Sequence, residues 1–236
     1  MPESDLKEKM VQYPSEGVTV RAFAVAPSVK ERRPAIILVQ EWWGLNDHMK
    51  DVARRYAKEG YVALVPDLFS RLGNRVTTDA NEAGKLMNAL PQADGLTDLQ
   101  ASIAFLKTAP EVEGSKIGVT GFCMGGSYAL MLPCVSRDVK ATVAFYGQVP
   151  DPDTPLQHLA CPLLYIYGED DGWITKTDVQ RLATALKKYN KPGEIKTYPG
   201  ASHAFFNDTR PEVYRPAEAK DAWNRAVAFV RQHLNA

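Results

Sequence analysis

The sequence has little cysteine, no net charge and no long apolar stretch, and each shortage excludes a class of protein. Three cysteines in 236 residues cannot supply the disulfide framework of a small secreted protein, so we expect a reducing, cytoplasmic location. Lys and Arg total 28, as do Asp and Glu, which argues against binding to nucleic acid or to an acidic membrane surface. The longest apolar run, residues 35–39, is far shorter than the roughly 20 residues of a membrane-spanning helix.

The sequence also lacks the patterns that hold metals and nucleotides. It contains four histidines, three of which are isolated from Cys, Asp and Glu in any ligand spacing, so no metal-ligand cluster is predicted. No G-x-G-x-x-G fingerprint follows the first strand. Cys134 and Cys161 share no C-x-x-C spacing and are interpreted as free thiols that behave as small apolar residues. We therefore expect neither a metal nor an organic cofactor.

Apolar residues make up 45% of the chain, and they are arranged in alternating strand and helix patterns. Residues 18–26 alternate between apolar and polar, as in a half-buried antiparallel strand. Continuous apolar runs at 35–40 and 61–65 are typical of parallel strands covered on both faces. Similar strands are predicted at 116–120, 141–146, 163–167 and 194–198, and helices at 46–59, 82–90, 98–107, 124–132, 177–189 and 217–234. This rhythm predicts one α/β domain over residues 1–236, with a mostly parallel central sheet and helices on both faces.

The strongest chemical signal is GFCMGG at residues 121–126, between a predicted strand and a predicted helix. It matches the nucleophile elbow G-x-S-x-G, with Cys123 in the place of serine. Glycines at 121 and 125 would leave room for the sharp turn. The N-terminus of the following helix would stabilise a thiolate and a developing oxyanion. The alternative is a buried structural cysteine in front of a glycine-rich helix.

An elbow of this kind belongs to the α/β-hydrolase order, in which an acid and then a histidine follow the nucleophile. The strand at 163–167 is followed by Gly-Glu-Asp-Asp-Gly, and the last strand is followed by a loop that contains His203. Adjacent side chains diverge, so only one of Asp170 and Asp171 can reach His203. The position of Asp171, midway between Gly168 and Ile174, favours Asp171 as the residue that orients the imidazole.

Together with GFCMGG, the segments VQEWWG (39–44) and GASHAF (200–205) resemble the dienelactone hydrolase (carboxymethylenebutenolidase) family. The resemblance implies an α/β-hydrolase fold with a minimal lid, and a Cys-His-Asp triad of Cys123, His203 and Asp171. It further implies that Glu41 holds the resting thiol and moves when substrate arrives. The backbone N–H groups of Trp42 and Met124 would form the oxyanion hole. The position of Glu41 also predicts a functional role without the resemblance, because Glu41 follows a buried strand at the edge where open α/β sheets bind ligands.

The sequence departs from the family where two arginines bind the carboxylate of the substrate. Phe206 and Asn207 stand where one arginine is expected after the histidine, with Arg210 displaced, and only Lys85 is cationic near the place of the other. We therefore expect an apolar or aromatic acyl group rather than a carboxylated one. The predicted substrate-binding residues, in addition to Trp42, are Trp43, Tyr146, Phe205, Phe206 and Arg210.

The predicted function is cysteine-dependent hydrolysis of a lactone or small ester through an acyl-enzyme. Two alternatives remain: hydrolysis of a thioester or aryl ester, and a non-catalytic member of the fold that binds a small ligand. The expected partner is a small-molecule substrate, and the sequence leaves the oligomeric state open.

Overall fold

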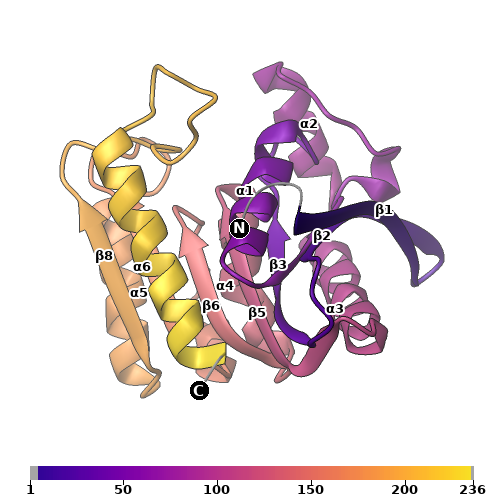
Figure 1. Ribbon diagram of the computed structural model, residues 1–236. Coiled ribbons are helices and arrows are strands. Elements are labelled where there is room, and N and C mark those ends of the chain that lie inside the picture. The colour runs from indigo at the N-terminus through magenta and orange to yellow at the C-terminus, as the bar shows by residue number, and fades with distance from the viewer. Residues whose placement is uncertain (1–4, 235–236) are drawn as a thin grey trace. The chain divides into compact units, whose positions relative to one another are not determined.

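The computed structural model describes residues 5–234. The chain divides into two compact units, Met1–Val119 and Thr120–Ala236, and β5 (Val112–Phe122) begins in the first and ends in the second. Both units alternate strands with helices (Figure 1).

The first unit contains four complete strands in the hydrogen-bonded order β1-β2-β4-β3. β2 pairs antiparallel with β1 and β4, as the alternating pattern at 18–26 predicts, and β3 pairs parallel with β4. The elements of this unit are β1 (Leu6–Ser15), β2 (Val18–Pro27), β3 (Arg33–Val39), α1 (Asp47–Lys58), β4 (Val62–Pro66), a 3-10 turn (Ser70–Leu72), α2 (Ala80–Ala89) and α3 (Gln92–Thr108).

Packing in the first unit follows from the apolar runs. Every residue of β4 is buried, because α1 packs against β2 and β4 while α3 packs against β1 and β4. α1 begins where the sequence predicts, since the side chain of Asn46 accepts a hydrogen bond from the N–H of Met49 at 3.1 Å and so caps the helix. Continuous burial of a parallel strand requires cover on both faces, and β4 has it.

The second unit contains three complete parallel strands, in the order β6-β7-β8. All six residues of β7 are buried. Figure 1 shows α6, in yellow, in front of these strands, with α4 and α5 behind them. The elements are α4 (Met124–Val135), β6 (Val139–Phe145), a 3-10 turn (Thr154–His158), β7 (Leu163–Gly168), α5 (Lys176–Lys188), β8 (Gly193–Tyr198) and α6 (Pro216–Leu234).

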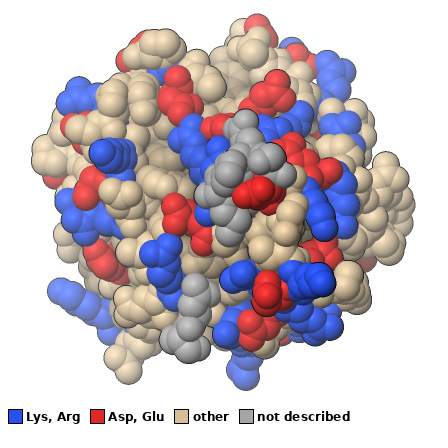
Figure 2. All heavy atoms as spheres, viewed as in Figure 1, with Lys and Arg blue, Asp and Glu red and all other residues tan. Residues whose placement is uncertain are grey.

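Positive and negative side chains are mixed on the face of the molecule that Figure 2 shows. On the face in Figure 2, basic and acidic side chains lie interspersed among uncharged ones. No helix within residues 5–234 is long and apolar enough to cross a membrane. Over the same residues, no three His, Cys, Asp or Glu side chains gather where a metal ion could be held.

Candidate active site

Cys123 occupies the turn between β5 and α4. Its backbone has φ 55° and ψ −119°, a strained combination that costs of order 1–3 kcal/mol and is concentrated at functional sites. The turn is held by the N–H of Cys123, which donates to the Phe145 carbonyl at 3.1 Å, and by the N–H of Ser127, which donates to the Cys123 carbonyl at 3.2 Å. Because α4 begins at Met124, the partial positive charge of its N-terminus lies next to Cys123.

Two glycines make this turn possible. A Cβ atom on Gly121 would collide with the carbonyl of Gly125, and a Cβ on Gly126 would collide with the carbonyl of Phe145. The first collision is the one expected of a nucleophile elbow. The second shows that α4 approaches the end of β6 too closely for any side chain at position 126.

Asp171 lies in the turn that follows β7, and its side chain is fully buried. Its Oδ1 accepts hydrogen bonds from the N–H groups of Trp173 at 2.7 Å and Ile174 at 2.8 Å. These bonds supply the partners that a buried carboxylate needs. The neighbouring Asp170 is exposed.

The acid turn is fastened to the loop that carries the histidine. The N–H of Glu169 donates to the Tyr198 carbonyl at 3.0 Å, and that of Asp170 donates to the Ala201 carbonyl at 2.9 Å. The two segments approach so closely that a Cβ on Gly168 would collide with the Ala201 carbonyl. Both loops follow adjacent parallel strands, β7 and β8, so the sheet brings them to the same edge.

This arrangement joins His203 to Asp171. The Nδ1 of His203 lies 2.7 Å from the Oδ2 of Asp171. A carboxylate can only accept, so Nδ1 carries a proton, and in the neutral imidazole Nε2 keeps a lone pair. Within the described part of the chain, Nε2 has no hydrogen-bond partner. A histidine oriented in this way, with its second nitrogen uncommitted, has the form of a general base.

Two aromatic rings flank the imidazole. Tyr146, at the end of β6, contacts His203 with ring centroids 4.9 Å apart, and Trp173 contacts it at 5.2 Å. Tyr146 has a positive φ of 40° and is buried, whereas Trp173 is 38% exposed. Trp173 is a residue of this site that was not predicted from the sequence. The available signal was a tryptophan two residues after the acid, in a turn that the fold places at the strand edge.

Glu41, Trp42 and Trp43 belong to the first unit, directly after β3. Glu41 is 1% exposed, and the rings of Trp42 and Trp43 meet edge to face at 5.0 Å. The carbonyl of Trp43 accepts a hydrogen bond from the N–H of Thr77 at 3.1 Å. Glu41 was predicted to follow a buried parallel strand, and it lies two residues after the end of β3.

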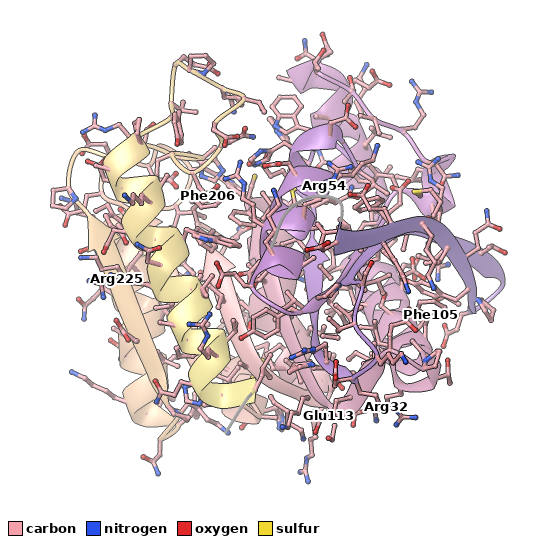
Figure 3. All side chains as sticks on the ribbon, in the orientation of Figure 1. Arg32, Arg54, Phe105, Glu113, Phe206 and Arg225 are labelled. Carbon is pink, nitrogen blue, oxygen red and sulfur yellow. The ribbon has the colours of Figure 1, made fainter. Side chains whose placement is uncertain are left out.

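Phe205, Phe206 and Arg210 were predicted to bind substrate, but the first two are buried and the third forms an ion pair. Phe205 and Phe206 are 0% and 1% exposed, and Figure 3 shows Phe206 beside α6. Phe206 stacks on Phe122 at 5.0 Å and also contacts Trp223 of α6. Their rings are core residues that support the histidine loop, and we do not assign them a place in a substrate wall. The Nε of Arg210 donates to Oε1 of Glu212 at 2.8 Å, so its charge is already paired.

The two remaining cysteines are Cys134, which is partly buried, and Cys161, which is buried. Burial raises the pKa of Cys134 to about 11 and that of Cys161 to about 12. Thiols of this kind stay protonated near neutral pH and react slowly.

The model of the dienelactone hydrolase family matches residues 20–234. The chain belongs to the dienelactone hydrolase family. It is therefore a hydrolase with the α/β-hydrolase fold, as the resemblance of its motifs implies.

Individual relatives cover nearly the whole chain. A protein of Synechocystis sp. named "Putative carboxymethylenebutenolidase" is 34% identical over 98% of this chain and 98% of its own length. A Bradyrhizobium protein named "Probable 2-oxo-3-(5-oxofuran-2-ylidene)propanoate lactonase" is 31% identical over 95% of this chain and 94% of its own. The solved structure of a "Putative Dienelactone Hydrolase" from Klebsiella pneumoniae matches with a TM-score of 0.91 and 31% identity, over 96% of this chain and 99% of that one.

Proposed function

We propose that this member of the family hydrolyses a small ester or lactone with Cys123 as its nucleophile, His203 as its base and Asp171 as the acid that orients the base. The observation that carries the proposal is the Asp171–His203 hydrogen bond of 2.7 Å in the same unit as a strained cysteine elbow. Nucleophile, acid and histidine also follow one another in the α/β-hydrolase order.

In this mechanism the Sγ of Cys123 attacks the carbonyl carbon of the substrate. The Nε2 of His203 takes up the thiol proton as Sγ attacks and then gives it to the leaving oxygen, so that an acyl-enzyme forms on Cys123. Water then attacks the acyl group while Nε2 takes up its proton, which regenerates the thiol and releases the acid. Asp171 holds the proton on Nδ1 throughout and stabilises the imidazolium.

The family resemblance supports roles for Glu41, Trp42 and Met124. Glu41 is a buried carboxylate that would accept a hydrogen bond from the resting thiol and move away when substrate binds, so that the thiol proton can pass to His203. The N–H of Met124, at the first position of α4, and the N–H of Trp42 would stabilise the oxyanion of the tetrahedral intermediate.

The substrate class rests on names and on charge. The names of both relatives describe enzymes that act on lactones, and each name also contains a carboxylate ("carboxy", "propanoate"). We extend only the lactone hydrolysis to this chain. The pairing of Arg210 with Glu212 supports a neutral substrate over a carboxylated one, because a free carboxylate needs an available cation.

Selective alkylation tests the nucleophile directly. The protein is treated with iodoacetamide at about pH 7, where Cys134 and Cys161 are expected to remain thiols, and both the labelled peptide and the remaining p-nitrophenyl acetate hydrolysis are measured. We expect a single label on Cys123 that accumulates in step with the loss of activity. A Cys134→Ala variant serves as the matched control and should be inactivated at the same rate. Full activity after complete labelling of Cys123 would contradict the proposal.

A further inference from the structure

Trp173 is a large aromatic side chain that reaches the surface beside the proposed base. It is 38% exposed, whereas Tyr146, Phe205 and Phe206 are each at most 1% exposed. A single exposed apolar residue is unremarkable on its own. Trp173 differs from such residues because its ring contacts the imidazole of His203.

The backbone of Trp173 is fixed by the acid itself. Its N–H donates to Oδ1 of Asp171 at 2.7 Å, and the next residue, Ile174, donates to the same oxygen at 2.8 Å and is buried. The tryptophan is therefore anchored to the carboxylate whose other oxygen holds His203.

The partly exposed indole ring of Trp173 contacts the imidazole of His203. The ring centroids are 5.2 Å apart and the planes meet at 77°, while the buried Tyr146 contacts the same imidazole at 4.9 Å. Of these two aromatic neighbours, Trp173 is the one with surface available to a bound molecule. Its exposed area can contribute about 25 cal/mol for each Å² that a ligand covers.

The turn that carries Trp173 has two acidic residues in front of Asp171 and one cation that is already paired, which disfavours a carboxylated ligand. Glu169 and the exposed Asp170 precede Asp171, and Lys176 pairs with Glu169 at 3.6 Å. A carboxylate placed against Trp173 would lie near acidic side chains. A flat, neutral group would instead gain the contact with the aromatic ring.

We propose that Trp173 forms the binding surface for the leaving group of the substrate and selects a flat, neutral aryl or alkenyl group there. The inference rests on the proposed function, because the leaving oxygen receives its proton from Nε2 of His203 and so must lie next to that ring. The leaving group, rather than the acyl group bound to Cys123, is then the part of the substrate nearest to Trp173.

The test compares two acetate esters with leaving groups of comparable acidity, phenyl acetate and hexafluoroisopropyl acetate. In Trp173→Ala, kcat/KM should fall about tenfold for the phenyl ester, the size of one good aromatic contact, and less than about twofold for the fluoroalkyl ester. Trp173→Phe should keep most of the preference for the phenyl ester. The pH–rate profile should be the same in all three proteins. An equal loss for both esters, or a displaced pH profile, would show that Trp173 only positions His203 and would overturn the proposal.

A binding measurement separates this proposal from the hydrolytic one. Acetanilide, the unreactive amide analogue of phenyl acetate, is titrated into the wild type and Trp173→Ala, and its dissociation constant is measured by ligand-detected NMR. Binding that is weakened about tenfold in the variant supports the aryl surface even if the protein hydrolysed neither ester. Equal binding to both proteins, or binding to neither, contradicts it whatever the hydrolytic activity is.

Discussion

The imidazole of His203 is held by Asp171 through a hydrogen bond of 2.7 Å between Nδ1 and Oδ2. The carboxylate is fixed in turn, because its other oxygen accepts two backbone N–H groups of its own turn. The orientation of the base is thus built into the turn after β7 and does not depend on substrate. An arrangement held by a buried carboxylate lowers the reorganisation needed during the reaction.

Replacing this carboxylate should damage catalysis far more than replacing its neighbour. Asp171→Asn should lower kcat/KM by at least about a hundredfold, because an amide favours the wrong imidazole tautomer. Asp170→Asn is the matched control and should change kcat/KM less than about threefold, since Asp170 is exposed and surface changes are usually mild. A larger loss in Asp170→Asn than in Asp171→Asn would reverse the assignment.

Glu41→Gln should reduce kcat while the protein stays folded. A carboxylate can accept the thiol proton, whereas an amide of the same shape cannot. The expected signature is a changed pH dependence of kcat/KM, measured alongside the far-UV circular dichroism spectrum and the melting temperature. If the pH–rate profile matches that of the wild type, Glu41 is a structural residue of the loop after β3.

The elbow should not tolerate a side chain at position 121. Gly121→Ala is expected to lower the free energy of unfolding by about 1–3 kcal/mol, the usual cost of overpacking, because its Cβ meets backbone that cannot rotate away. Gly172→Ala is the control, since no atom lies within 4 Å of a Cβ built there. Urea denaturation of both variants checks the difference, and equal stabilities would show that the turn adapts.

The substrate should be neutral. We expect a neutral aryl ester to be hydrolysed with a kcat/KM at least equal to that for a carboxylated dienelactone at matched pH and salt, because Arg210 is paired with Glu212. Arg210→Ala should leave the ratio of the two values unchanged. A strong preference for the charged lactone that disappears in Arg210→Ala would show that Arg210 leaves Glu212 to bind a carboxylate.

The sequence predicts most of the fold because buried strands and capped helices leave local signals. The apolar run at 163–167 becomes β7, Leu163–Gly168. The helix expected at 177–189 is α5, Lys176–Lys188, which begins with a capping box between Thr175 and Asp178. The predicted helix at 98–107 is too short, since α3 starts at Gln92 and contains a glycine that obscures its first turns.

The strand β1, Leu6–Ser15, went unpredicted for a different reason. Its burial is low along most of its length, so it lacks the apolar alternation that identifies a half-buried strand. Its partner β2 determines its place, through antiparallel pairing of Leu6 with Pro27 through to Ser15 with Val18. Tertiary pairing of this kind has little signature in the sequence of the strand itself.

Part of the site could be predicted from the order of its residues, and part could not. The elbow, the acid and the histidine each follow a strand, so strand order alone brings Asp171 and His203 to one edge. The aromatic residues near them lie in loops without periodicity, where nothing in the sequence says which rings face inward. Phe205 and Phe206 were therefore expected in the substrate wall and lie in the core, while the exposed Trp173 was overlooked.

The role of Cys123 as the nucleophile is tested by the kcat of Cys123→Ala for ester hydrolysis. The variant should fold like the wild type, because the side chain removed is small and sits at a turn. Its kcat should fall by at least about a thousandfold, leaving the residual rate that binding and the oxyanion hole provide. A folded Cys123→Ala protein that keeps more than about a tenth of the wild-type kcat would contradict the account.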